Sequence, residues 1–487
     1  MKLKTSFFNT GIFLQDLKQH GWISLLYFGG LFFAIPIQLL QRNSFESYNT
    51  TINDNLFIVQ GFFQLIILFT VPILAGIFLF RYLQEKKSAD YIHSLPIRRE
   101  TLYSTHLISG FFLLLAPICL TTILVALITI IQPTATFSFS FGNIVTWAAV
   151  FSFFTIFLFL FTVVVGMITS LGVVQGIFTY IFLVLPTMLI QLILYQLETH
   201  LFGFPSGYMN SLGVELWSPL FTIYNYFPMG RFPITIWIIY PILCLVLIWL
   251  GLILYRIRSI EVTSQVINFR LLQPVLKVGV TVCSMLLVGA YYSGQSVYLG
   301  YFIGAISGYI IVEMAYQKTW KIISYQSLKS FFGYAIALSS ILFLVQLYLN
   351  DYEDRLPKKN SINGAYLGYS RMDMEDRLAN GQEIFTDQAD FIDNVLILHE
   401  MALSEGERYI KSTDPVYTVI SEDADDFAVH TVGYDAQDFV NIFIAYELTN
   451  GKLFVREYFI PLDSDGSIME FLKETRDDNN NLVSDLN

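Results

Sequence analysis

Runs of about 20 apolar residues recur along most of this chain, and they constrain its fold more than any other feature of the sequence. A helix needs about 20 mostly apolar residues to cross the hydrocarbon core of a bilayer. The composition agrees with such spans, because 54% of the 487 residues are hydrophobic and only 14% are charged. These values are far from those of a typical water-soluble protein. The sequence therefore predicts an all-α polytopic membrane domain.

Nine runs are long and apolar enough to be membrane spans. They are residues 22–40, 56–82, 102–131, 143–169, 171–196, 233–255, 278–294, 297–316 and 331–349. An odd number of spans places the two termini on opposite sides of the membrane. The predicted membrane domain covers residues 21–349.

Lysine and arginine set the orientation of these spans, because short cytoplasmic loops carry an excess of both. With the N-terminus inside, the outer loops keep only Arg42 and Arg231. The cytoplasmic segments then hold Lys2, Lys4, Lys18, Arg81, Lys86, Lys87, Arg98, Arg99, Arg256, Arg258, Arg270, Lys277, Lys318, Lys321 and Lys329. The pattern predicts a multi-pass protein of the cell membrane with a cytoplasmic N-terminus and an extracellular C-terminal domain.

Residues 1–20 form a pattern of their own before the first span. Apolar side chains lie along one side of a helix, and no small-residue cleavage site follows them. This pattern favours an interfacial helix against the inner leaflet rather than a signal peptide. A frayed terminus is the alternative.

Residues 350–487 differ in composition from everything before them. They hold 29 acidic and 11 basic residues, a net charge of −18, whereas the rest of the chain has a net charge of +7. The pattern of apolar residues predicts strands at 362–369, 439–448 and 453–460, and apolar residues at helical spacing predict a helix at 387–403. A last helix is expected to begin at 467–472. Together these elements predict an α+β domain, which the orientation of the spans makes extracellular. Asn450-Gly451 between two strands predicts a type I′ hairpin. The acidic surface either attracts cationic peptides or serves solubility alone.

No catalytic, cofactor or metal site is predicted within this chain. Cys119, Cys244 and Cys283 all lie in apolar runs, and no Cys/His spacing resembles a zinc site. His399-Glu400 begins like a zinc-protease helix, but position 403 is leucine. No phosphate-binding G-x-x-x-x-G-K-[ST] loop is present, so ATP and Mg would have to be bound elsewhere.

The stretch from Gln84 to Tyr103 interrupts two apolar runs with a short polar segment, QEKKSADYIHSLPIRRETLY. Ala89, Ile92 and Leu95 would share one side of a two-turn helix at the membrane surface, and Pro96 would end it. A solvated loop between two spans is the simpler interpretation.

The pattern E-K-x-S-A-D-Y-x-H-S-L-P-I-R-R-x-x-L-Y in this stretch resembles permease subunits of ABC type-2 exporters. Within them it is most similar to a Gram-positive group that includes Ytr-like transporters linked to cell-envelope antibiotic stress and exporters of cytolytic peptides. The resemblance covers the first six predicted spans, whereas nine are predicted here. It implies that residues 84–96 form a coupling helix that fits a cleft on a cytoplasmic ATPase subunit. The implied contact residues are Ser88, Ala89, Asp90, Tyr91, His93, Leu95 and Pro96, with Arg98 and Arg99 at the rim.

The function implied by this resemblance is export of an amphiphilic solute, such as a peptide or antibiotic. The expected partners are cytoplasmic ABC ATPase subunits that bind ATP and Mg, a second permease subunit that is identical or homologous, and membrane lipids, with no nucleic acid. The chain itself would not be an enzyme. The alternative is an envelope-stress receptor or immunity protein that binds antimicrobial peptides through its extracellular domain.

Two further features are open to more than one interpretation. Glu313 lies in an apolar run, where it either reaches the inner interface or acts as a functional carboxylate. The loop before the sixth span is rich in aromatic residues and proline, with Trp217, Tyr224, Tyr226 and Phe227 among them. These residues form either an interfacial aromatic belt or a gate for an amphiphilic solute.

Overall fold

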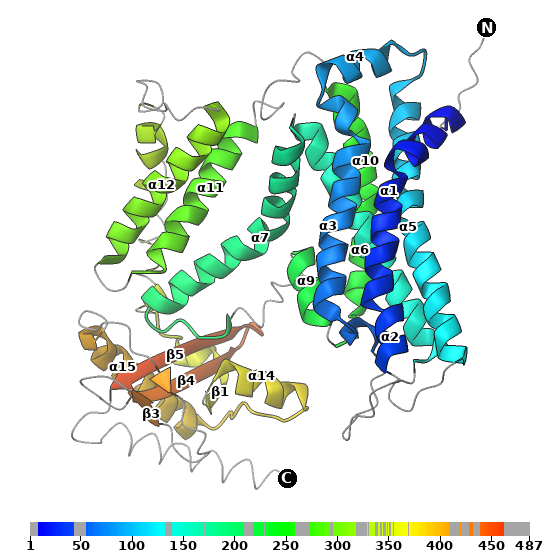
Figure 1. The fold of residues 1–487 in the computed structure, drawn as a ribbon. Coiled ribbons are helices and arrows are strands. Elements are labelled where there is room, and N and C mark those ends of the chain that lie inside the picture. The colour runs from blue at the N-terminus through cyan, green and yellow to red at the C-terminus, as the bar shows by residue number, and fades with distance from the viewer. Residues whose placement is uncertain are drawn as a thin grey trace. The chain divides into compact units, whose positions relative to one another are not determined.

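The fold is that of a computed structural model of the chain (Figure 1). The structure describes residues 8–42, 55–131, 139–169, 171–208, 218–227, 229–230, 232–258, 272–292, 296–317, 355–368, 370–409, 418–419, 428–431 and 439–461, with a few single positions and short pieces between 329 and 353. These residues divide into two compact units. Unit 1 comprises residues 1–187 and 215–274, and unit 2 comprises residues 188–214 and 275–487.

Seven helices among the described residues are long and apolar enough to cross a membrane. They are α1 (Thr10–Ala34, continued by α2, Pro36–Arg42), α3 (Gly61–Leu79), α5 (Arg99–Ile131), α6 (Phe141–Ile168), α7 (Gly172–His200), α10 (Ile234–Ile257) and α12 (Val297–Gln317). The prediction of a helical membrane domain is confirmed at this level.

Three of the predicted spans differ from the helices that the structure describes. The predicted boundary at residue 21, between an interfacial helix and the first span, falls inside the continuous helix α1. The apolar part of α11 (Leu272–Gly289) is shorter than the other spans and covers only Lys277–Gly289. Most of the predicted span at 331–349 lies outside the described residues.

Unit 1 is a bundle in which α6 packs against α3, α5 and α10, and α1 packs against α3 and α5 (Figure 1). Its core is largely aromatic and aliphatic, and a buried polar cluster links α6 to α3 within it. The indole N–H of Trp147 on α6 donates to Oε1 of Gln64 on α3 at 2.9 Å. The amide of Gln64 donates to the carbonyl oxygens of Leu56 and Val59. Such bonds are required in lipid, because no water is present to satisfy a polar group.

Two short helices of this unit, α4 and α9, each connect two long helices in the sequence. The helix α4 (Lys86–Ser94) follows the 3-10 turn η2 (Arg81–Leu83) and lies across one end of the bundle (Figure 1). The helix α9 (Pro219–Tyr226) begins with proline at its first position and belongs to the predicted aromatic loop. Trp217 of that loop lies outside the described residues.

In unit 2, α11 and α12 approach each other along a row of glycines on α12. A Cβ atom on Gly304 would lie 2.5 Å from the carbonyl oxygen of Ser284 and 2.7 Å from Cα of Met285, both on α11. Only glycine permits this spacing, as in other closely packed membrane helices. Near one end of this pair, the Lys277 ammonium lies 2.5 Å from the carboxylate of Glu313. Both side chains are largely buried, so Glu313 is part of an ion pair between two helices.

The C-terminal part of unit 2 is a small α+β domain, called the β-domain below. Its five-stranded antiparallel sheet has β4 (Phe439–Leu448) paired with β1 (Ile362–Gly368) and β5 (Leu453–Pro461), while β3 (Ala428–Thr431) joins β4 to β2 (Thr418–Val419). The helices α14 (Arg371–Ala379) and α15 (Ala389–Tyr409) pack against it. The predicted strands and the helix at 387–403 are confirmed, whereas the predicted helix at 467–472 lies outside the described residues.

The predicted type I′ turn between β4 and β5 is wrong. Gly451 has a φ of +74°, but Asn450 does not share a positive φ with it. The backbone N–H of Leu448 donates to the carbonyl of Lys452 at 2.9 Å, which closes a three-residue loop. A loop of this length places its left-handed residue last, so that only the glycine needs a positive φ.

The segment that follows α7 packs against the outer edge of β5 within unit 2. The carboxylate of Glu457 accepts hydrogen bonds from the backbone N–H and the hydroxyl of Ser206, at 2.5 and 2.7 Å. The backbone N–H of Glu457 donates to the carbonyl of Gly203, and the Phe202 ring lies 5.0 Å from that of Tyr458. The β-domain therefore binds the segment 202–206, which follows α7.

Candidate functional site

The stretch that the sequence singled out forms the helix α4 and the turns on either side of it. Glu85 lies just before the helix, and its carboxylate accepts from Arg81 at 2.9 Å and from the hydroxyl of Ser88 at 3.1 Å. At the other end, the hydroxyl of Ser94 donates to the carbonyl of Tyr91 at 2.7 Å. Leu95 is extended, as expected for a residue that precedes proline. Local polar contacts thus define both ends of a helix of 9 residues.

The side chains of α4 divide into an inner and an outer face. Ala89 is 2% exposed, whereas Tyr91 is 69% exposed. Lys87 and Asp90 are also exposed, and Ile92 is half-buried. The outer face therefore offers a large aromatic ring between charges of both signs. Such a surface can bind a protein partner, because aromatic residues dominate the energetics of protein interfaces.

The structure places the predicted site residues in three groups. The exposed ones are Asp90, Tyr91, Pro96 and Arg98, and the half-buried ones are Ser88, Leu95 and Arg99. Ala89 faces the protein and holds the helix in place, so it is not on the outer face. His93 lies in the last turn of α4.

Arg258, which directly follows α10, fixes the turn η2 that precedes α4. Its guanidinium donates to the carbonyl of Leu83 in η2 at 2.9 Å, and to the carbonyls of Gly166 and Met167 at the end of α6 at 2.6 and 3.3 Å. These carbonyls include groups that a helix end leaves without intrahelical partners. Burial lowers the pKa of Arg258 to about 10, so the guanidinium stays charged near neutral pH. One side chain therefore ties together η2, α6 and α10.

Additional contacts surround Arg258 at this end of the bundle. The guanidinium of Arg99 donates to the carbonyls of Arg256 and Arg258 at 3.3 and 3.4 Å. The side chain of Arg256 pairs with Glu100 at 2.6 Å. Since Arg99 and Glu100 begin α5, this helix is joined to the end of α10. Arg99 was predicted to lie at the rim of the site, and its hydrogen bonds are made within the chain itself.

Buried polar side chains connect η2 to the helices beneath it. The hydroxyls of Tyr82 and Tyr255 lie 3.1 Å apart, and burial raises the pKa of Tyr82. The amide of Gln84 donates to Gln175 of α7 at 2.5 Å, and Gln175 donates to the carbonyl of Thr162 at 2.9 Å. A displacement of α4 would therefore be passed to α6, α7 and α10 through short, directional bonds.

These supporting residues were not identified from the sequence. Arg258 counted only as one of the positive charges that set the orientation, and Gln84 and Gln175 lie 91 residues apart. A polar residue at the end of an apolar run was the available signal. It does not reveal which carbonyl groups, more than 90 residues away, the side chain will reach.

Neither a metal site nor a known relative identifies the function of this region. The described residues contain no group of His, Cys, Asp and Glu that could hold a metal ion. No protein-family model matches the chain, and no curated protein matches it either.

Proposed function

We propose that the chain is the permease subunit of an ATP-binding cassette exporter that moves an amphiphilic solute, such as a peptide or antibiotic, across the cell membrane. In this proposal, separate cytoplasmic subunits bind ATP and Mg and drive transport, and a second permease completes the pathway. The single observation that carries the proposal is α4, a short helix with an exposed polar face between two long apolar helices.

The surroundings of α4 support a mechanical role. A partner would bind the outer face through Tyr91 and Asp90, while Ala89 packs against the protein and the network around Arg258 holds the turn η2 that precedes α4. A movement of α4 would reach α6 and α10 through these hydrogen bonds, whereas a flexible loop would absorb it. A loop that merely connected two spans would not need the hydrogen bonds that the residues just before α4 make to α7 and α10 and to Arg258.

The β-domain contact supports the proposed membrane topology. A helix that crosses a bilayer has its two ends on opposite sides, and residues 202–206 at the C-terminal end of α7 bind β5. The β-domain therefore shares a side with that end of α7. We propose that this side is the outside, with the N-terminus inside, because the distribution of lysine and arginine favours that orientation.

Co-purification tests the partner. The full chain is purified from its host in mild detergent, and the eluate is assayed for ATP hydrolysis and for a subunit that carries a phosphate-binding loop. Tyr91→Ala should reduce its retention by about 30-fold, as expected for an aromatic anchor at the centre of an interface. Tyr224→Ala is the matched control, because Tyr224 on α9 is 67% exposed and lies outside the site. The absence of such a subunit, or equal loss in both variants, would contradict the proposal.

Cysteine labelling tests the topology independently of the partner. Asn380→Cys lies at an exposed position of the β-domain, and Lys87→Cys lies at an exposed position of α4. In intact cells, a membrane-impermeant maleimide should label the first variant and not the second, which should react only after lysis. The reverse pattern would reject the proposed orientation.

A further inference from the structure

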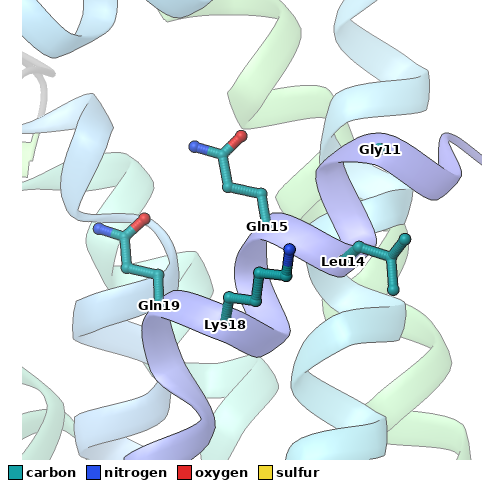
Figure 2. Close-up of a pocket in the computed structure, with 5 residues that line it drawn as sticks. All are labelled: Gly11, Leu14, Gln15, Lys18 and Gln19. Atoms are coloured by element: carbon teal, nitrogen blue, oxygen red, sulfur yellow. The ribbon is translucent and has the colours of Figure 1, made fainter.

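The first turns of α1 carry a shallow hollow on their outward face. Figure 2 shows its lining, in which polar side chains project from neighbouring turns of this one helix. The lining residues are Gly11, Leu14, Gln15, Lys18 and Gln19. Their spacing of three or four residues places them on one face of the helix. The hollow thus combines one ammonium group with two side-chain amides.

The opposite face of these turns is anchored on α5, so the hollow cannot turn inward. The backbone N–H of Asn9, which caps α1, donates to Oγ1 of Thr105 at 3.1 Å. The carboxylate of Asp16 lies 2.8 Å from Nδ1 of His106, and both side chains are buried. Asn9 and Asp16 lie on the side of α1 opposite the hollow, and their contacts with α5 hold the helix in a single rotation about its axis.

Lys18 differs from two other cations of unit 1, Arg81 and Arg256. Arg81 is paired with Glu85, and Arg256 is paired with Glu100. Among the residues that the structure describes, no carboxylate forms an ion pair with Lys18. An uncompensated ammonium flanked by amide donors favours an anion with several acceptor oxygens.

Beyond the hollow, the same face of α1 becomes apolar. Trp22, Leu25 and Leu26 follow Lys18 by about 6 to 12 Å along the helix, at ~1.5 Å per residue, and all three are exposed, with Leu25 at 75%. The Trp22 ring packs edge-on against Phe78 at 5.2 Å. Tryptophan at this position marks the boundary between headgroups and acyl chains.

We propose that this face of α1 binds one anionic phospholipid. The headgroup phosphate would lie in the hollow against Lys18, Gln15 and Gln19, and an acyl chain would run past Trp22 along Leu25 and Leu26. The order of chemistry along the face, from cation to indole to aliphatic surface, matches the order of parts in such a lipid. The proposal needs only that α1 lies in a membrane, so it does not depend on the transport function.

Native mass spectrometry of the full chain in neutral detergent tests the proposal. The protein is titrated with phosphatidylglycerol and, separately, with phosphatidylcholine of the same acyl chains. We expect one phosphatidylglycerol molecule to bind more tightly than phosphatidylcholine. Lys18→Gln should weaken that binding by about fivefold, as expected for one cation near an anionic headgroup, whereas Lys18→Arg should stay within twofold of the native chain.

Two further measurements separate a site from general surface charge. Lys87→Gln removes an exposed lysine of α4 and should leave the phosphatidylglycerol affinity unchanged. Glycerol phosphate, which has the headgroup charge without the chains, should not compete at the concentrations at which the lipid binds. Equal binding of the two lipids, or equal losses in Lys18→Gln and Lys87→Gln, would overturn the proposal.

Discussion

Acidification should destabilise the β-domain through one buried side chain, His399 on α15. Its Nδ1 lies 3.2 Å from the hydroxyl of Tyr446, and its Nε2 lies 2.7 Å from that of Tyr458. The Tyr446 hydroxyl donates its own hydrogen to the carbonyl of Val395. It must therefore accept from Nδ1–H, which leaves Nε2 as the acceptor for Tyr458. This assignment of the hydrogens leaves no place for a second proton on the ring.

The size of the effect follows from the pKa of His399. Burial, together with the charge of Arg456, lowers this pKa from 6.5 to about 3. Between these two values the unfolded chain binds a proton that the folded domain does not, so stability falls as the pH drops below about 6.5. At pH 5.0 the loss is about 2 kcal/mol, from ~1.4 kcal/mol per pH unit over about 1.5 units.

Hydrogen–deuterium exchange of the full chain in detergent provides the assay. The protection of the β4 amides is measured at pH 7.5 and at pH 5.0, after correction for the pH dependence of intrinsic exchange. Protection should fall about 30-fold in the native chain, which corresponds to about 2 kcal/mol. In His399→Gln this 30-fold part of the fall in protection should be absent, because glutamine supplies one donor and one acceptor without a titrating group.

An equal loss of protection in the native chain and in His399→Gln would refute this reasoning. The acidic residues of the domain would then account for the whole response, because their protonation acts in both proteins. A rise in protection at pH 5.0 would contradict the neutral state assigned to His399.

Three further predictions concern the helices, each tested by chemical unfolding of the purified chain in detergent. Glu313→Gln should destabilise unit 2 by about 3 kcal/mol, because it leaves Lys277 buried without its partner, and replacing both residues with apolar ones should recover most of that loss. Gly304→Leu should separate α11 from α12 and lower stability, whereas Gly279→Leu, where a Cβ meets nothing within 4 Å, should change it little. Trp147→Phe should cost about 2 kcal/mol, since it removes a buried N–H donor to an α3 amide together with packing volume. Unchanged unfolding midpoints in Glu313→Gln, Gly304→Leu or Trp147→Phe would contradict the corresponding contact.

The sequence predicted those elements whose signal is local. The apolar runs gave the positions of α3, α5, α6, α7 and α10 to within a few residues, because a membrane span is defined by its own composition. The strands of the β-domain were predicted from alternation over 7 to 10 residues. The short polar segment with a proline gave α4.

The remaining features depend on partners far away in the chain. The three carbonyls that Arg258 reaches, and the contact of Ser206 with Glu457 across 251 residues, leave no periodic pattern in the sequence. The turn type was missed for a different reason. Asn-Gly is compatible with both two-residue and three-residue loops, and the hydrogen bond from Leu448 to Lys452 decides between them.

The contact between the segment after α7 and β5 also bears on how the chain avoids self-association. An exposed strand at the edge of a sheet can pair with the same strand of another molecule and start aggregation. Here the outward N–H of Glu457 is occupied by the carbonyl of Gly203, and its carboxylate is held by Ser206. During synthesis the ribosome makes Ser206 long before β5, so the segment that covers this edge already exists when the strand emerges.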